Sequence, residues 1–120
     1  MGIFRKLEER LDRSPEEEQA PKIREWASKV PGAEFVAKCQ PRTHQRVAGV
    51  VESIKLTPRD YTYLLEVQIF DGTEQITGVW YGRRKIPGID LGCRIMLEGT
   101  IGCDNDDLKI INPAYALLPA

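Results

Sequence analysis

The sequence predicts a mainly β fold, a five-stranded Greek-key barrel with an N-terminal α-helical extension. Apolar residues recur at every second position from about Gln45 onward, whereas before that point they follow helical spacing. Turn-forming residues separate the alternating segments at regular intervals. The chain has 120 residues, 42% of them hydrophobic, which is enough for one core. We therefore divide it into a helical extension and linker, residues 1–44, and a barrel, residues 45–120.

Two helical segments are expected within residues 1–44. The first has an apolar stripe at three-to-four spacing, formed by Ile3, Phe4, Leu7 and Leu11. Residues 14–17 (SPEE) form a capping box, and Pro21 is expected to interrupt that turn. A helix then restarts with an apolar face of Ile23, Trp26, Ala27 and Val30. Both stripes can pack on the barrel, and the first helix can instead bind a partner protein or a second copy. Its polar face has charges of both signs, which disfavours a membrane-surface helix.

Five strands are expected after the linker. They cover residues 46–56 (RVAGVVESIKL), 61–70 (YTYLLEVQIF), 75–81 (QITGVWY), 94–103 (RIMLEGTIGC) and 108–112 (LKIIN). After Pro113 the chain can continue extended through Tyr115 and Leu118. Residues 57–60 (TPRD) are expected to break the first strand, Asp71-Gly72 to form a tight hairpin turn, and residues 104–107 (DNDD) to form a further turn. Residues 82–92, with three glycines and Pro87, form a loop.

Composition excludes several functional classes. The formal charge of −1 supplies no overall attraction to phosphate, so a polycationic protein that coats duplex DNA is excluded. Three cysteines without a signal peptide indicate free thiols in a reducing cytoplasm. No apolar run approaches the roughly 20 residues that a membrane span needs. A single histidine, His44, without a close cysteine pair argues against a zinc site. Because no catalytic or cofactor-binding motif is found, we expect a non-enzymatic protein without a cofactor.

Several segments resemble a known family when they are taken in sequence order. They are residues 47–51 (VAGVV), 71–73 (DGT), 79–81 (VWY), 91–99 (LGCRIMLEG) and 111–113 (INP). Their order resembles the OB-fold nucleic-acid-binding domains of the tRNA-anticodon type, and the wedge domain of a branched-DNA helicase has a similar pattern. Residues 80–84 (WYGRR) and 86–89 (IPGI), behind a short helical extension, resemble the small stand-alone OB-fold proteins of actinobacteria. The resemblance covers residues 45–118 and implies a cytoplasmic, non-enzymatic module that binds single-stranded DNA or RNA.

Aromatic candidates for base stacking follow from strand alternation. In an OB barrel the binding surface is the outer face of the second and third strands. If Leu65, Val67 and Ile69 point inward, Phe70 points outward, and Tyr81 points outward by the same argument on the next strand. Both can stack on unpaired bases. The alternative is that they are rim aromatics packed on the N-terminal helices. Trp80 has inward parity and is expected in the core.

Basic candidates cluster directly after Tyr81. Arg83, Arg84 and Lys85 are the only run of three basic residues, in a glycine-flanked loop that can follow phosphates or can be an ordinary solvated loop. Lys55 and Arg59, near the first inter-strand loop, can extend the groove, and Lys109 is a weaker member. The acidic turn at 104–107 would repel phosphate if it bordered the same groove. The alternative function is a protein-interaction or assembly module that uses the barrel face or the N-terminal helices.

Overall fold

A computed structural model describes residues 14–120, with side chains from residue 19 onward. The expected first helix, at residues 3–11, lies outside the described residues. The elements are helix α2 (Ser14–Ser28), a single 3₁₀ turn η1 (Val36–Lys38) and strands β1 (His44–Arg59), β2 (Thr62–Phe70), β3 (Gln75–Tyr81), β4 (Arg94–Asp104), β5 (Asp107–Ile111) and β6 (Ala114–Leu118). No helix within this part of the chain is long and apolar enough to cross a membrane.

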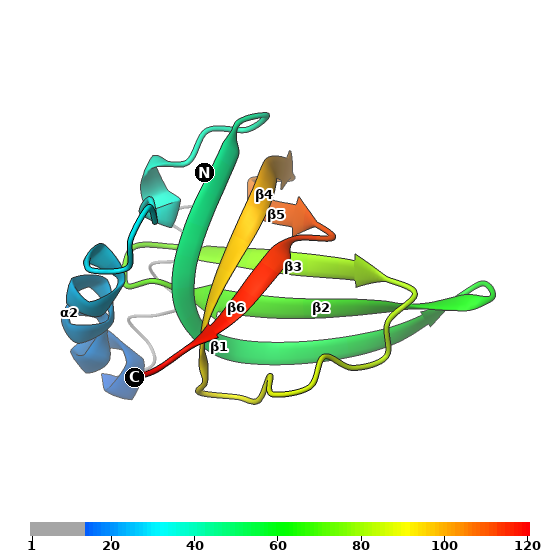
Figure 1. Ribbon diagram of the computed structural model, residues 1–120, viewed down its shortest axis with the longest axis horizontal. Helices are drawn as coiled ribbons and strands as arrows, with labels where there is room; N and C mark the ends of the chain where they lie inside the picture. Colours follow the sequence, from blue (N-terminus) through cyan, green and yellow to red (C-terminus); the bar gives the residue numbers. More distant parts are fainter. Residues whose placement is uncertain (1–13) are drawn as a thin grey trace.

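The strands form one sheet that closes on itself (Figure 1). Their order is β1-β2-β3-β5-β4, and β4 pairs with the first half of β1 to close the ring. The β3–β5 pairing is parallel, whereas the other pairings are antiparallel. After Pro113, β6 pairs with the first half of β4, whereas β5 pairs with its second half. The mainly β barrel predicted from the sequence is confirmed, and the division of the chain at residue 44 stays a prediction.

Two prolines lie inside elements that the sequence expects them to break. Helix α2 continues through Pro21, so the predicted interruption is wrong. A proline removes one helical hydrogen bond and crowds the preceding turn, and the burial of Ile23 and Ala27 offsets that cost. Strand β1 likewise continues through Pro58 to Arg59. Here β2 is the only described strand that pairs with β1, and such an edge position tolerates a missing N–H.

The barrel interior is a single cluster of aliphatic side chains with Trp80 at one end. Trp80 is buried, as its parity predicts, and it makes an edge-on contact with Tyr115 at 6.1 Å between ring centroids. Val36 of η1 and Ile86 of the β3–β4 loop reach the same cluster from outside the strands. The core therefore depends on two connecting segments as well as on the sheet.

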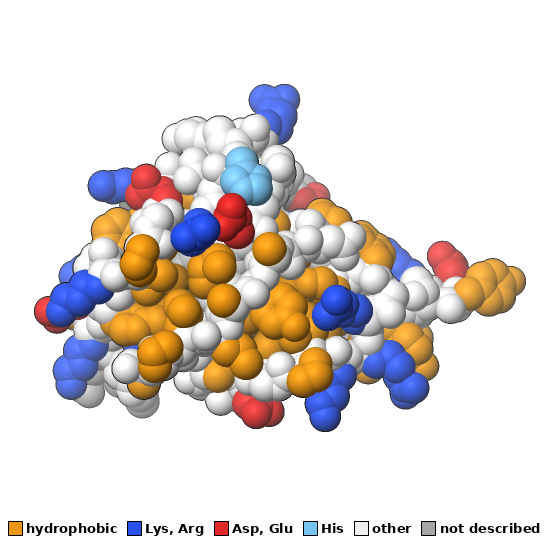
Figure 2. Space-filling view, viewed as in Figure 1, with side chains coloured by type: hydrophobic (Ala, Val, Ile, Leu, Met, Phe, Trp, Pro, Cys, Tyr) orange, Lys and Arg blue, Asp and Glu red, His pale blue; other side chains and the backbone are white. Residues whose placement is uncertain are grey.

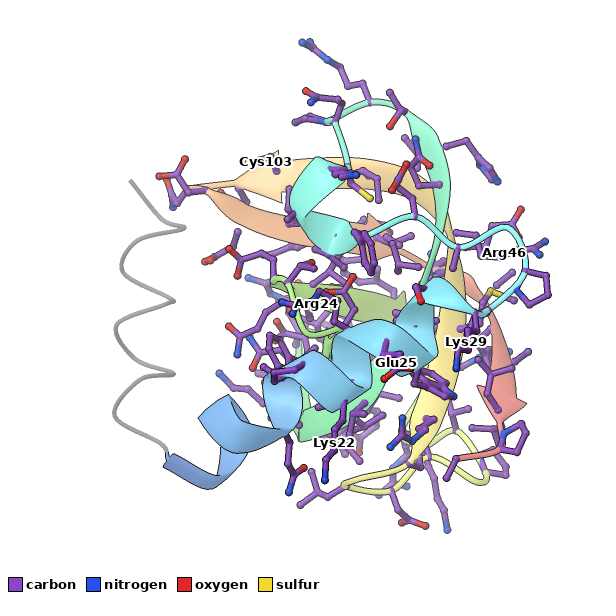
Figure 3. All side chains as sticks on the ribbon, turned by 90° about the vertical axis from the view of Figure 1, so that its left-hand side faces the viewer. Lys22, Arg24, Glu25, Lys29, Arg46 and Cys103 are labelled. Atoms are coloured by element: carbon purple, nitrogen blue, oxygen red, sulfur yellow. The ribbon has the colours of Figure 1, made fainter. Side chains whose placement is uncertain are left out.

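The turn between β2 and β3 ties the N-terminal segment to the barrel. The fully buried Asp71 carboxylate accepts hydrogen bonds from the backbone N–H groups of Val36 (2.7 Å), Thr73 (2.8 Å) and Glu74 (3.2 Å). The backbone of Gly72 lies directly against α2, next to Arg24. Figure 3 shows α2 lying across this side of the barrel.

The apolar face of α2 therefore packs on the barrel. Ile23 and Ala27 are buried, and the Arg94 guanidinium of β4 lies 4.7 Å from the centre of the Trp26 ring. The packing expected for the second stripe is confirmed.

Candidate nucleic-acid interface

Tyr81 lies on the outer face of the β2–β3 sheet. Directly paired residues on neighbouring strands project to the same side. Leu65 pairs with Trp80, and both point into the core, so the adjacent pair of Leu64 and Tyr81 points outward. The Tyr81 side chain is 48% exposed. About half of this residue is therefore accessible to a ligand.

Lys55 and Arg59 share this outer face. Lys55 pairs with Glu66, the residue between the inward-pointing Leu65 and Val67, and Arg59 pairs with Thr62 nearer the hairpin tip. Both cations are exposed. No ion pair among the described residues involves either of them. The structure thus brings Lys55, Arg59 and Tyr81 together on one surface, which we call the outer face.

The expectation that Phe70 is an exposed stacking residue is wrong. Its parity is outward as predicted, but only 2% of its surface is exposed. Phe70 immediately precedes the turn that lies against α2, where Gly72 contacts Ala20 and Arg24. The alternative stated from the sequence, a rim aromatic packed on the N-terminal helices, stays a prediction. Strand alternation gave the direction of this side chain but not its burial.

Asn112 fixes the end of β3, and therefore the position of Tyr81. Its side-chain Oδ1 accepts a hydrogen bond from the Tyr81 backbone N–H at 3.2 Å, and its own N–H donates to the Val79 carbonyl at 2.6 Å. Asn112 adopts a left-handed conformation, with φ of 47°, which asparagine tolerates better than most residues. Sequence reasoning missed this role, although an asparagine directly before Pro113 was the available signal.

The basic loop lies on the other side of the β1–β2 hairpin. The Arg84 guanidinium lies 4.8 Å from the centre of the Tyr63 ring. Tyr63 belongs to the inward-pointing row of β2, beyond the end of the closed barrel, where it is half-buried. The Gly82 N–H donates to the Tyr63 carbonyl, which holds the start of the loop against β2. Sequence reasoning expected Tyr63 to point inward but missed its contact with Arg84.

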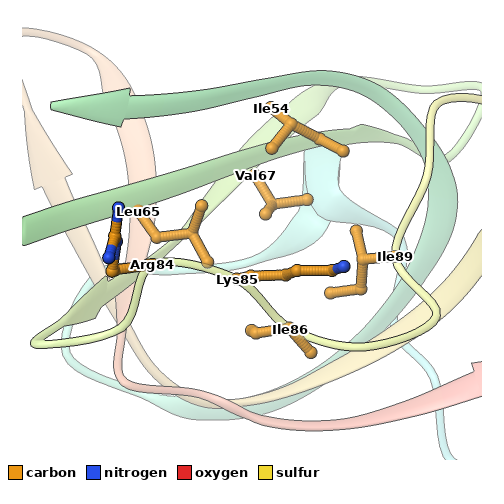
Figure 4. A pocket seen from close by; sticks show the side chains of 7 residues that line it. All are labelled: Ile54, Leu65, Val67, Arg84, Lys85, Ile86 and Ile89. Atoms are coloured by element: carbon orange, nitrogen blue, oxygen red, sulfur yellow. The ribbon is translucent and has the colours of Figure 1, made fainter.

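Arg84 and Lys85 line a small pocket with a volume of about 70 Å³ (Figure 4). The remaining lining residues are all aliphatic: Ile54, Leu65, Val67, Ile86 and Ile89. Arg83 is exposed and lines no part of this pocket. The seven predicted site residues therefore do not form one surface. Tyr81, Lys55 and Arg59 lie on the outer face, Arg84 and Lys85 lie beside the pocket, and Phe70 is buried.

The acidic turn lies before β5, level with the start of β3, whereas Tyr81 lies at the end of β3. Lys109 of β5 pairs with Thr77 of β3. Thr77 lies between the buried Ile76 and Gly78, so Thr77 and Lys109 both point outward. The Lys109 ammonium lies 3.3 Å from the Asp104 carboxylate. This ion pair neutralises the weaker basic candidate.

The face over β4 and β6 has a different character. Figure 2 shows hydrophobic side chains gathered at its centre, with Lys and Arg at its margins. Leu117 of β6 is among the exposed large apolar residues of the described chain. A surface with an apolar centre offers little to a phosphate backbone, so this face is not the candidate interface.

Among residues 19–120, two titratable groups are shifted by their surroundings, and both lie away from the outer face. Hydrogen bonds from His44 and Arg46, each at 2.9 Å, lower the pKa of the Glu98 carboxyl. Burial, with smaller contributions from the Glu34 and Asp71 charges, raises the pKa of the free Cys39 thiol to about 11. Such a thiol stays protonated at neutral pH, so it is a structural rather than a reactive group.

Comparison with solved structures decides the fold. The structure of RecG bound to a three-way DNA junction matches 73% of this chain, with a TM-score of 0.55 and 13% identity. A replication protein A heterotrimer bound to ssDNA matches 78% of the chain, with a TM-score of 0.51 and 15% identity. The barrel is an OB fold. The OBody AM1L10 bound to hen egg-white lysozyme also matches, over 76% of the chain, with a TM-score of 0.53 and 19% identity.

The share of each neighbour's chain that this protein covers differs widely. This chain covers 12% of the RecG chain, 71% of the replication protein A chain and 97% of the OBody. No family model and no curated protein matches the sequence. The solved structures therefore establish the OB fold, and function has to be argued from the surface of this barrel.

Proposed function

We propose that this protein is a non-enzymatic module that binds single-stranded DNA or RNA across the outer face. The observation that carries the proposal is the exposed Tyr81 ring on the same face as Lys55 and Arg59. Its support from known structures is that two OB-fold neighbours were solved with DNA, RecG at a three-way junction and replication protein A with ssDNA.

Each component has a defined physical part in such a complex. A base stacked on the Tyr81 ring contributes about 1–3 kcal/mol and requires no particular sequence, because every base has a flat face. Lys55 and Arg59 pair with phosphates, and Arg83, exposed two residues after Tyr81, can extend the same path. Arg84 is less available because it already lies on the Tyr63 ring.

Fluorescence anisotropy with labelled single-stranded DNA and RNA at low salt tests the proposal. We expect saturable binding that Tyr81→Ala weakens about tenfold, from loss of one stacked base. The double variant Lys55→Ala/Arg59→Ala should weaken it at least as much. The matched control is Lys22→Ala/Arg24→Ala, which removes two exposed cations from α2 and should leave binding unchanged.

A triple variant of the basic loop separates the two faces. We expect Arg83→Ala/Arg84→Ala/Lys85→Ala to weaken binding less than the outer-face double variant, although it removes one more charge. Absence of saturable binding would refute the proposed function. Retention of full affinity in both outer-face variants would refute the assignment of the site to this face.

A further inference from the structure

The pocket beside the basic loop has walls that suit an apolar side chain. Leu65 and Ile86 form part of its lining and are almost fully buried, whereas Ile54 stands at the rim with 41% of its surface exposed. Apart from Arg84 and Lys85, every residue that lines it is aliphatic. Its volume of about 70 Å³ is well below the roughly 300–1,000 Å³ of small-molecule sites. It can therefore take one side chain and not a whole cofactor.

The rim of the pocket carries positive charge that nothing described neutralises. Arg84 and Lys85 take part in no ion pair among residues 19–120, and no carboxylate lines the pocket. Contact with the Tyr63 ring holds the Arg84 guanidinium beside the opening. Figure 4 shows Arg84 and Lys85 approaching the pocket from the loop, opposite Ile54 and Val67 of the hairpin.

This chemistry distinguishes between two classes of occupant. A nucleotide base placed here would lose the water that solvates its polar edge. Five of the seven lining side chains are aliphatic and offer no hydrogen bond in return, and Arg84 and Lys85 offer donors but no acceptor. An aliphatic side chain has no such requirement. The cations at the rim then favour carboxylates on either side of that side chain.

We propose that this pocket binds an acidic peptide segment of a partner protein, with one apolar side chain inserted between Ile54 and Ile86. Carboxylates that flank the inserted side chain pair with Arg84 and Lys85. The site is distinct from the outer face, so the two bindings are independent and the chain can join a nucleic-acid strand to a protein.

The test uses a short fluorescein-labelled peptide with a single leucine among aspartates. We expect saturable binding by the full chain at low salt. A control peptide with serine in place of leucine should bind about tenfold more weakly, because it lacks the anchor that fills the pocket. Ile54→Ser and Lys85→Gln change exposed positions and should each weaken binding of the leucine peptide by a similar factor, with urea unfolding used to confirm that both variants fold.

Two further measurements separate this site from the outer face. Tyr81→Ala and Lys55→Ala/Arg59→Ala should leave peptide affinity unchanged, and a single-stranded oligonucleotide should not displace the peptide. The proposal is overturned if the peptide does not bind saturably, if Ile54→Ser and Lys85→Gln retain full affinity, or if the oligonucleotide competes. None of these results bears on the proposed function of the outer face, which is tested separately by the nucleic-acid titration.

Discussion

Among single residues, Asp71 joins two parts of the chain that are far apart in sequence. One carboxylate oxygen accepts from Thr73 and Glu74 within its own turn, and the other accepts from the Val36 N–H, 35 residues earlier in the sequence. The sequence predicts the turn, because Asp-Gly is a local signal. It does not predict the link to Val36, since no local pattern specifies which distant N–H group will meet a buried carboxylate.

Asp71→Asn should break the distant link and keep the local turn. The amide oxygen can replace the carboxylate oxygen that faces Thr73 and Glu74, but the amide N–H₂ then opposes the Val36 N–H, donor against donor. We expect a loss of about 2–3 kcal/mol in the free energy of unfolding, the range for a hydrogen bond to a buried charged group. Urea denaturation measures it, and hydrogen exchange should show faster exchange of the Val36 amide. Asp60→Asn, an exposed carboxylate in a left-handed turn position that asparagine also tolerates, is the control and should change stability little.

At the scale of elements, the accuracy of the sequence-based prediction depends on whether local or distant contacts decide the outcome. The strands were predicted within a few residues, because a period of two and turn residues are local signals. Pro21 and Pro58 were misassigned because packing of α2 and an edge position in β1 override local preference. The alternation of β3 predicted the side of the sheet on which Tyr81 lies. It could not predict that Arg84 lies on another side, because that depends on the path of the β3–β4 loop.

The docking of α2 depends on the absence of a side chain at Gly72. A Cβ there would lie 2.5 Å from the Arg24 backbone N and 2.6 Å from the Ala20 carbonyl oxygen, and the residue has φ of +93°. Gly92 has a similar φ of +86° but no atom within 4 Å of the added Cβ. Comparing substitutions at these two glycines therefore distinguishes the cost of backbone strain from the cost of a steric clash with the helix.

Gly72→Ala should destabilise the protein much more than Gly92→Ala. Left-handed strain costs about 1–2 kcal/mol at either position, and overpacking against α2 adds about 1–3 kcal/mol at Gly72 alone. Urea denaturation of the two variants gives the difference. Hydrogen exchange of α2 amides should accelerate only in Gly72→Ala. Equal destabilisation by the two substitutions would contradict the idea that the helix is held by this close approach.

At the scale of the whole molecule, near-zero net charge conceals a separation of charges. Of the eight basic residues in 45–120, Lys55 and Arg59 lie on the outer face and Arg84 and Lys85 line the pocket. Lys109 is paired with Asp104. The acidic turn and the basic run therefore do not cancel in space as they do in the total. The sequence showed both groups, but only the closed barrel shows that the acidic turn and the basic run lie at opposite ends of β3.

This arrangement predicts weak nucleic-acid binding with a strong dependence on salt. If three cations contact phosphates of a single strand, log K should fall with log[salt] with a slope of about −2, so raising the salt from about 50 to about 200 mM lowers affinity roughly 20-fold. Asp104→Asn removes one negative charge and releases Lys109, so affinity should rise several-fold and the slope should steepen by about 0.7. Anisotropy titrations at several salt concentrations measure both quantities. Asp90→Asn removes an equal charge from the exposed β3–β4 loop and serves as the control. If both substitutions changed the affinity equally, the effect would come from net charge alone, and the acidic turn would have no particular relation to the bound strand.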